Sequence, residues 1–308
     1  LQLCNSGDEI IRNRTVYGGT YAFMKNFLPK FNIKTKFINT NNLDEVKKSI
    51  TNKTKVIYCE SMSNPLLDVS DIESLSKITK KNGIKLVVDN TFAPLIFSPS
   101  KLGADIVIHS LTKFINGSSD TVAGVICADE DIIKSMIDVN YGSAMLLGPV
   151  MDSMRSASVL KNIRTLHLRM KKHSENAMYL AQSFQKSGLK VIYPGLIGCR
   201  TYDLMKKQMN EGFGFGGMLL VDAETKYKAN KLMEEMQNCN LGYLAVSLGF
   251  YKTLFSSPSL STSSEIPEED REKIGISEGL VRISIGLDND INRTYLTMLK
   301  CMKKVGVL

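Results

Sequence analysis

The chain has 308 residues, of which 43% are hydrophobic and 23% are charged, and its formal net charge is +8. This composition is typical of a globular protein with a hydrophobic core, and the length predicts two domains or one large domain. No run approaches the roughly 18 consecutive apolar residues that a membrane-spanning helix needs. Basic residues occur in pairs such as Lys47-Lys48, without exposed aromatics between them, so a generally basic surface is favoured over a nucleic-acid site.

The cysteines and histidines argue against a disulfide framework or a metal centre. The six cysteines show no CxxC spacing, and several fall inside apolar runs. This pattern predicts reduced, buried thiols in a cytoplasmic protein. With only three histidines in the chain, no bound metal is expected.

In the first half of the chain, short apolar runs alternate with longer amphipathic segments. The predicted strands cover residues 55–59, 84–88, 105–109 and 122–127. A helix is predicted over residues 69–81, beginning at a cap formed by Ser70 or Asp71 and ending before Gly83. Nearly continuous apolar strands with helical crossovers predict an α/β fold with a largely parallel sheet and helices on both faces.

The second half has a different pattern. After Pro149 there is no Pro or Gly up to Ser187, and apolar residues recur at helical spacing, which predicts one long helix or two. Further elements are strands at 217–222, 244–246 and 280–285, a helix at 223–236, a Ser-rich loop at 256–264 and a terminal helix. We therefore expect a large domain over residues 1–160 and a smaller α+β domain over 161–308 that includes the linking helix.

Residues 212–217 match G-x-G-x-x-G, the fingerprint of dinucleotide-binding loops. That loop needs a strand before it and a helix after it, whose N-terminus meets the pyrophosphate. Here the glycines follow a polar helical stretch and lead into a strand. A flexible loop that enters a strand is the favoured interpretation.

Two polar segments follow neighbouring predicted strands. Asp89 ends one strand, and Ser110, Thr112 and Lys113 come just after another. α/β folds bind ligands at this edge of the sheet. In an extended segment Ser110 and Thr112 would point to one side and Lys113 to the other. Pyridoxal phosphate needs a lysine for its aldehyde, an anion for its ring nitrogen and donors for its phosphate, and these segments offer all three. Taken singly, Asp89 could instead cap a turn and Lys113 could be a surface charge.

These segments resemble the signature of the Cys/Met-metabolism pyridoxal-phosphate enzymes, and the resemblance extends along nearly the whole chain. Its further motifs are residues 16–20, 60–65, 162–166, 246–249 and 275–284. The family includes cystathionine γ-synthase, cystathionine γ- and β-lyases, O-acetylhomoserine sulfhydrylase and methionine γ-lyase. The resemblance implies an aspartate-aminotransferase-like fold, PLP-dependent transferase fold type I, with the cofactor in the large domain.

The resemblance also implies roles for residues on the cofactor side. Lys113 would bond to the cofactor's aldehyde and carry protons, while Asp89 would pair with its ring nitrogen. Ser110 and Thr112 would bind the phosphate. Asn64 would face the 3′-oxygen. In addition, Tyr17 would stack on the ring and protonate the leaving group.

On the substrate side, the resemblance implies that Arg282 binds the substrate carboxylate as a two-pronged fork, which a lysine could not copy. Ser247 would line the same end of the pocket. Judged from the residues alone, Tyr17 could equally be turn packing, Arg282 a paired strand residue and Ser247 a strand end.

The implied activity is α,γ-elimination on methionine or homocysteine, giving 2-oxobutanoate, ammonia and a thiol, by a cytoplasmic homotetramer built as a dimer of dimers. Gly19 and the lysine-free segment 141–148 depart from the best-known methionine γ-lyases. The Gly18-Gly19 turn is closer to the cystathionine enzymes, whereas residues 248–255 and the Ser-rich loop resemble methionine γ-lyases of anaerobes. Cystathionine γ-lyase, cystathionine γ-synthase and O-acetylhomoserine sulfhydrylase are therefore alternatives. A catalytically inactive binding protein of the same fold is an alternative of another class.

The first residues, Leu1-Gln2-Leu3-Cys4-Asn5, lack an initiating methionine. Members of the family begin several tens of residues earlier, with a segment that supplies part of the phosphate site. From this resemblance we expect a chain truncated at its N-terminus, which by itself holds the cofactor weakly.

Overall fold

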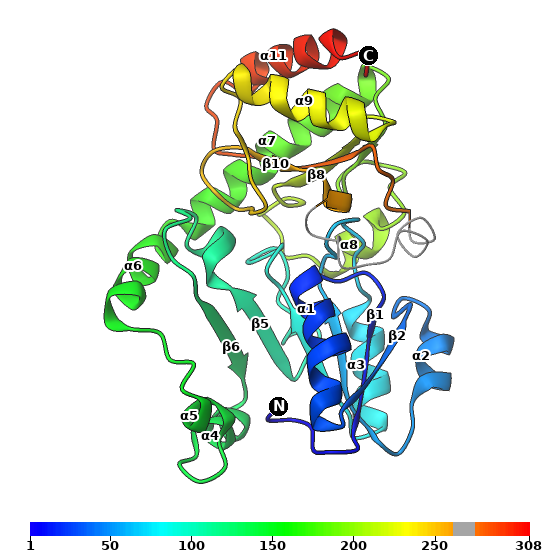
Figure 1. The fold of residues 1–308 in the computed structure, drawn as a ribbon, viewed down its shortest axis with the longest axis vertical. Helices are drawn as coiled ribbons and strands as arrows, with labels where there is room; N and C mark the ends of the chain where they lie inside the picture. Colours follow the sequence, from blue (N-terminus) through cyan, green and yellow to red (C-terminus); the bar gives the residue numbers. More distant parts are fainter. Residues whose placement is uncertain (261–274) are drawn as a thin grey trace.

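The computed structural model describes residues 1–260 and 275–308, which form two β-sheets with helices around them. The lower sheet in Figure 1 has six strands in the order β2-β1-β3-β4-β5-β6, and the upper sheet has five in the order β7-β8-β11-β10-β9. Among the described residues, no helix has the length and apolar character needed to cross a membrane.

The six-stranded sheet is mostly parallel, as predicted. Its strands are β1 (Glu9–Asn13), β2 (Lys34–Ile38), β3 (Thr54–Glu60), β4 (Lys85–Asp89), β5 (Ile106–Ser110) and β6 (Gly124–Ala128). All neighbouring pairs are parallel except β5 and β6, which are antiparallel. The carboxyl ends of β3, β4 and β5 therefore meet at one edge, where ligands bind in such sheets.

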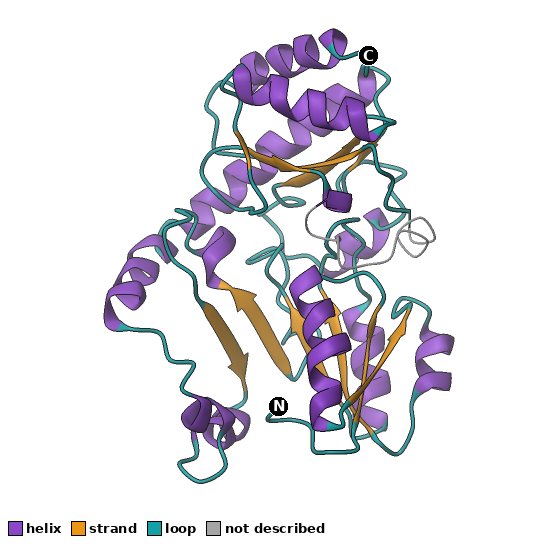
Figure 2. Cartoon of the chain, in the orientation of Figure 1, coloured by secondary structure: helices purple, strands orange, loops and turns teal. Residues whose placement is uncertain are grey.

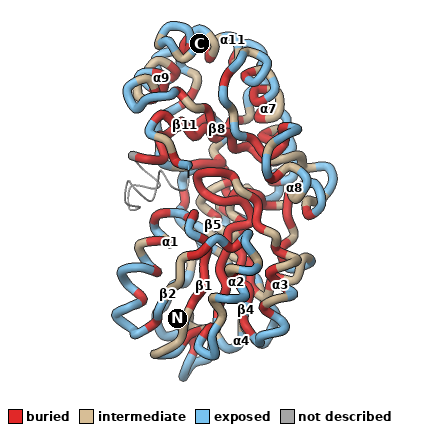
Figure 3. The backbone as a smooth tube through the Cα atoms, turned by 90° about the vertical axis from the view of Figure 1, so that its right-hand side faces the viewer, coloured by how far each residue is buried: buried red, intermediate tan, exposed pale blue. Residues whose placement is uncertain are grey.

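Helices cover both faces of this sheet, which confirms the predicted layers. On one face lie α2 (Leu43–Ser49) and α3 (Ile72–Lys81), and on the other α1 (Gly18–Ala22), which continues through helical turns at Phe23–Phe27 and Leu28–Phe31. Buried backbone concentrates in the strands and in the segments between the two sheets (Figure 3).

Helix α3 begins and ends where its local sequence directs. The side chain of Asp71 accepts a hydrogen bond from the N–H of Ser74 at 3.0 Å, so Asp71, one of the two predicted caps, is the one used. Lys80 and Lys81 in the last turn complement the helix dipole. Gly83 follows with a φ of +65°, a conformation that glycine adopts without strain.

The smaller sheet carries three helices packed against one face (Figure 2). Its strands are β7 (Val191–Ile192), β8 (Met218–Asp222), β9 (Tyr243–Leu244), β10 (Leu254–Ser256) and β11 (Leu280–Ser284). The helices are α7 (Leu166–Lys186), α9 (Lys226–Asn238) and α11 (Ile291–Lys304), with the short α8 (Tyr202–Gln208) nearby. Of the predicted Ser-rich loop, residues 258–260 form a 3₁₀ turn, and residues 261–264 lie outside the described residues.

The predicted long helical stretch is two helices, α6 (Ser153–Ile163) and α7. The break occurs where the carbonyl of Asn162 accepts hydrogen bonds from the side chains of Thr165 and Arg169. Together with α4 (Glu130–Ile137) and α5 (Ser143–Leu147), α6 lies to the side of the two sheets in Figure 1. The domain boundary predicted at residues 160 and 161 falls inside α6 and stays a prediction.

The predictions for the glycine-rich segment and for the cysteines have opposite outcomes. The glycines of residues 212–217 lead into β8, as predicted, and no helix begins there. The prediction of buried thiols is wrong for Cys127 and Cys239, which are exposed. Cys127 lies on the edge strand β6, and Cys239 is the residue at which α9 ends. All six cysteines are described and unpaired.

Candidate active site

A cavity of about 330 Å³ lies at the carboxyl edge of the six-stranded sheet, closed on its other side by β11 and the segment before β10. Seven of the eight predicted site residues line this cavity. They are Tyr17, Asn64, Asp89, Ser110, Thr112, Lys113 and Arg282. The eighth, Ser247, accepts a hydrogen bond from the amine of Lys113 at 3.1 Å. The structure therefore brings together residues that are up to 265 positions apart in the chain.

Lys113 reaches the cavity because the chain after β5 does not stay extended. Residues Leu111–Ile115 form a helical turn in which Lys113 has φ −91° and ψ −130°. This kink turns Lys113 toward the same cavity as Ser110 and Thr112, so the expectation that it points to the opposite side is wrong. Burial, and secondly the positive charge of Arg282, lower the pKa of Lys113.

The turn that carries Lys113 is held from α7. Arg169 donates hydrogen bonds to the main-chain carbonyls of Phe114, Ile115 and Asn162. Gly117 has a φ of +72°, and a Cβ at this position would lie 2.5 Å from Nη1 of Arg169. The glycine therefore leaves room for the guanidinium that fixes this turn.

Asp89 is fixed at both of its carboxylate oxygens. Oδ1 accepts the N–H of Thr91 at 2.9 Å, and Oδ2 accepts the hydroxyl of Tyr58 at 3.2 Å. Burial, and secondly the charge of Asp89, raise the pKa of Tyr58 well above its usual value, so the hydroxyl keeps its proton and donates. Glu60 lies beside Asp89 in register. Burial and that neighbouring carboxylate raise the pKa of Glu60 to about 8.

Arg282 is a buried cation at the other end of the cavity. Its Nη1 donates to Oδ1 of Asn64 at 3.0 Å, and its Nη2 donates to the carbonyl of Ser247 at 3.3 Å. Burial lowers the pKa of Arg282 to about 10, so it stays charged at neutral pH. These two bonds orient the guanidinium as a fixed positive group, which suits an anionic ligand.

The remaining predicted residues differ in how firmly they are held. The hydroxyl of Thr112 accepts the N–H of Ala123 at 3.0 Å, whereas Tyr17 is 50% exposed. A Cβ at Gly19 would lie 2.6 Å from Cε1 of Tyr17. Gly19 therefore lets the Tyr17 ring lie against the start of α1.

The donor set of this cavity fits pyridoxal phosphate. Lys113 offers a half-buried amine with a lowered pKa for the aldehyde, and Asp89 offers a carboxylate for the ring nitrogen. Ser110 and Thr112 bring hydroxyls to the same cavity for the phosphate. No group of three or more potential metal ligands occurs in the part of the chain that the structure describes.

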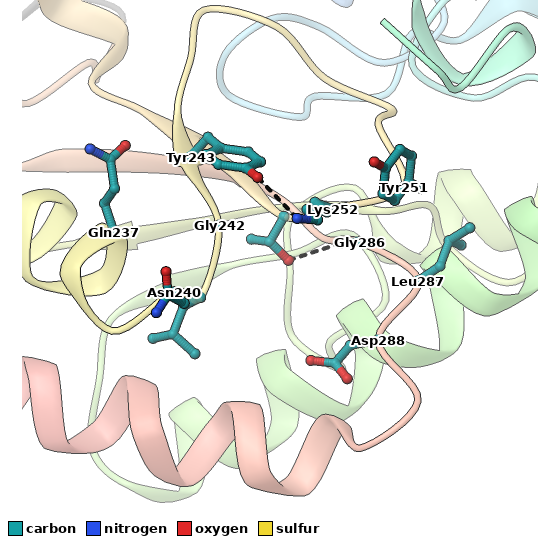
Figure 4. Close-up of a pocket in the computed structure, with 11 residues that line it drawn as sticks. Gln237, Asn240, Gly242, Tyr243, Tyr251, Lys252, Gly286, Leu287 and Asp288 are labelled. Atoms are coloured by element: carbon teal, nitrogen blue, oxygen red, sulfur yellow. Dashed lines mark hydrogen bonds between the residues drawn. The ribbon is translucent and has the colours of Figure 1, made fainter.

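A second cavity, of about 520 Å³, lies between the segments that follow α9 and precede α11. Figure 4 shows that its polar groups bond to one another: Lys252 donates to the hydroxyl of Tyr243 at 2.9 Å, and the N–H of Gly286 donates to the Thr253 hydroxyl at 3.0 Å. Its lysine, Lys252, is exposed, and the hydrogen bond to Tyr243 raises the pKa of Lys252, whereas the pKa of Lys113 in the first cavity is lowered.

The sequence interpretation missed three supporting residues. Glu60 lines the cavity, Tyr58 bonds to Asp89, and Arg169 holds the turn of Lys113. The signal that pointed to Asp89, a carboxylate at the end of a buried strand, is equally present at Glu60. Arg169 belongs to a helix remote in sequence, and no local pattern identifies its partners.

Comparison with known proteins agrees with this geometry. Residues 1–292 match the family described as Cys/Met metabolism PLP-dependent enzyme. A methionine γ-lyase of Arabidopsis thaliana is 46% identical over 93% of this chain and 66% of its own length. An L-methionine γ-lyase of Fusobacterium nucleatum is 38% identical over 92% of this chain and 71% of its own. The chain thus spans about two thirds of the length of these relatives.

The fold is that of solved enzymes as well. A cystathionine γ-lyase from Lactobacillus plantarum, complexed with L-serine, superposes with a TM-score of 0.90 at 29% identity. The superposition covers 99% of this chain and 78% of that one. The match over nearly the whole sequence, together with a lysine and a carboxylate at one sheet edge, shows that the chain belongs to the Cys/Met metabolism family of PLP-dependent enzymes.

Proposed function

We propose that the protein is a PLP-dependent carbon–sulfur lyase that converts methionine or homocysteine, with water, into 2-oxobutanoate, ammonia and a thiol. The observation that carries this proposal is the convergence of Lys113, Asp89 and Arg282 on one cavity. Family membership and the 46% identity to a methionine γ-lyase support it. When bound, the cofactor would supply an electron sink that stabilises negative charge at the substrate Cα.

Binding and orientation fall to residues that are already fixed. Asp89 would hold the ring nitrogen in its protonated form, with Tyr58 and Thr91 orienting the carboxylate. Ser110 and Thr112 would hold the phosphate, and Asn64 would face the 3′-oxygen. Arg282 would bind the substrate carboxylate, and Met62, Phe92 and Leu248 give the same cavity apolar lining for the rest of the side chain.

Proton transfer would fall to Lys113 and Tyr17. The lowered pKa of Lys113 increases the fraction of free amine at neutral pH, which is the form that attacks an aldehyde or removes a proton. Its Nζ would take the proton from the substrate Cα, pass it on to C4′ of the cofactor, and then take a proton from Cβ. Tyr17, at the exposed side of the cavity, would donate its phenolic proton to the departing sulfur.

The choice of substrate is tested by incubating the purified protein with pyridoxal phosphate and methionine and measuring 2-oxobutanoate. Lys113→Ala is expected to abolish both product formation and the yellow absorbance of bound cofactor. Turnover of cystathionine, or of O-acetylhomoserine with sulfide, without turnover of methionine would contradict the proposed substrate. A colourless protein that takes up no pyridoxal phosphate would instead support the inactive binding protein.

We also propose that the protein acts as a homotetramer in the cytoplasm. Large apolar side chains are exposed along α4, α5, α6 and their connections. They are Ile137, Val139, Tyr141, Met145, Leu146, Leu147, Val150, Met154, Leu160 and Ile163. Exposed apolar side chains concentrated in one part of the chain are typical of a subunit interface, and six unpaired cysteines are consistent with a reducing compartment. Light scattering of the purified protein tests the tetramer; a monomer would refute it.

A further inference from the structure

Glu60 is a buried carboxylate in the cavity for which the proposed reaction provides no role. It ends β3, is 6% exposed and lies in register with Asp89 on β4. Its two oxygens have separate partners. Oε1 accepts the main-chain N–H of Tyr17, and Oε2 accepts the main-chain N–H of Asn64, each at 2.8 Å.

Neither N–H group takes part in the regular hydrogen bonds of a sheet or a helix. Tyr17 is the residue before the first turn of α1, and Asn64 lies in the connection after β3. Both side chains line the cavity, and Oδ1 of Asn64 also accepts a hydrogen bond from Arg282 at 3.0 Å. One carboxylate therefore ties together two segments that are 43 and 4 residues away from it in the chain.

We propose that Glu60 is a positioning residue, which holds the main chains of Tyr17 and Asn64 so that their side chains meet the cofactor. Because Asn64 bonds to Arg282, Glu60 also orients Arg282 for the substrate. This inference rests on the proposed function. It separates the roles of two carboxylates that lie side by side. Both oxygens of Glu60 accept main-chain N–H groups of other segments, which gives it the role of holding those segments, while Asp89 keeps the role beside the ring nitrogen.

A buried cation supports the charged form of Glu60. Arg12 is fully buried, and its guanidinium lies 5.0 Å from the ring centre of Tyr21 and 4.2 Å from that of Phe37. Its three nitrogens have no hydrogen-bond partner among the described residues, so Arg12 acts here by charge. The N–H groups of Tyr17 and Asn64, and after them this charge, lower the pKa of Glu60 against the larger effects of burial and of Asp89, which together raise it to about 8. A carboxylate accepts two N–H groups better than a neutral acid does.

The first measurement is amide hydrogen exchange in the 308-residue chain without cofactor. Glu60→Gln keeps the size of the side chain, but its NH₂ group cannot accept an N–H, so one of the two bonds must be lost. We expect the amide of Tyr17 or Asn64 to exchange at least about tenfold faster. Glu211→Gln, at an exposed glutamate in the segment after α8, is the matched control and should leave both amides unchanged. Wild-type exchange rates at both amides in Glu60→Gln would overturn the proposal.

The second measurement is cofactor and substrate binding. Glu60→Gln should weaken pyridoxal phosphate binding at least about tenfold, as measured by absorbance titration. It should also raise KM more than it lowers kcat, because Asn64 no longer holds Arg282 in its orientation. Lost amide protection with unchanged cofactor affinity and KM would overturn the positioning role.

The two proposals can fail separately. If the wild-type protein takes up no pyridoxal phosphate, the proposed function fails, and the exchange rates still decide whether Glu60 holds the two segments. If Glu60→Gln does not fold, Glu60→Asp serves instead, because it keeps both carboxyl oxygens but is one methylene shorter. The shorter side chain of Glu60→Asp should protect only one of the two amides from hydrogen exchange, and protection of both would overturn the proposal.

Discussion

Gly249 offers a direct test of how closely the two sides of the active site must approach. It has a φ of +74°, and its N–H donates to the hydroxyl of Ser284 at 2.9 Å. A Cβ at this position would lie 2.7 Å from Cα of Phe114 and 2.8 Å from the carbonyl carbon of Lys113, with the nitrogen of Phe114 also in contact. The backbone of the lysine turn therefore fits directly against this glycine.

The expected effect of Gly249→Ala can be worked out from these distances. Carbon atoms in contact are normally about 3.5–4.0 Å apart, so the lysine turn and the 246–249 segment must separate by roughly 1 Å. Overpacking of this kind costs about 1–3 kcal/mol, and a left-handed conformation costs a non-glycine residue about 1–2 kcal/mol more. A displacement of about 1 Å at a reacting group lowers the rate about 10²-fold.

The control is Gly188→Ala. Gly188 has a similar φ of +86°, but a Cβ there would meet nothing within 4 Å. Urea unfolding should show a loss of about 1–2 kcal/mol for Gly188→Ala and a clearly larger loss for Gly249→Ala, with a changed cofactor absorbance only in the latter. Equal losses of stability with unchanged cofactor absorbance in both variants would refute the reasoning.

Three further predictions concern residues around the same cavity. Arg282→Lys should raise KM for the amino-acid substrate at least about tenfold, because a single ammonium cannot replace a two-pronged fork; an unchanged KM would contradict the assigned role. Burial lowers the pKa of His173 to about 4, and its Nδ1–H donates to the carbonyl of Ile285 at 2.6 Å. Below pH 6.5 the unfolded chain binds more protons at this residue than the folded chain, so His173 contributes a fall of about 3 kcal/mol in unfolding free energy between pH 6.5 and 4, and the pH profiles of the wild type and His173→Gln should differ by this amount. Arg169→Lys should lower stability and cofactor affinity, because a lysine cannot bond all three carbonyls; unchanged values of both would show that the turn of Lys113 holds by itself.

The parts of the fold that follow from local sequence were predicted well. Strands β3, β4 and β5 are apolar runs, and the cap at Asp71 is a local pattern. Strands β1 and β2 were missed because neither is a plain apolar run: β1 includes Arg12, buried beside two aromatic rings, and β2 carries two lysines. The antiparallel direction of β6 depends on pairing with β5, which is a tertiary choice.

The site was predictable to the extent that chemistry coincides with strand ends. Asp89 and Lys113 could be found in this way, and Glu60 satisfies the same condition but was assigned no role. Arg282 and Ser247 come from distant parts of the chain, and their place beside Lys113 depends on how the second sheet packs on the first. Only the family resemblance linked them to the site in advance.

Helix α7 bonds to both sides of the cavity and thereby fixes the distance between them. Arg169 bonds to the turn of Lys113, and one turn later His173 bonds to the main chain at the end of β11, the strand that carries Arg282. Asn176 continues the series by donating to the carbonyls of Gly286 and Asp288. Because all three polar side chains belong to one helix, a shift of α7 would move the lysine and the substrate-binding arginine together. Variants along α7 should therefore affect cofactor affinity and KM jointly, whereas Arg282→Lys should change KM alone.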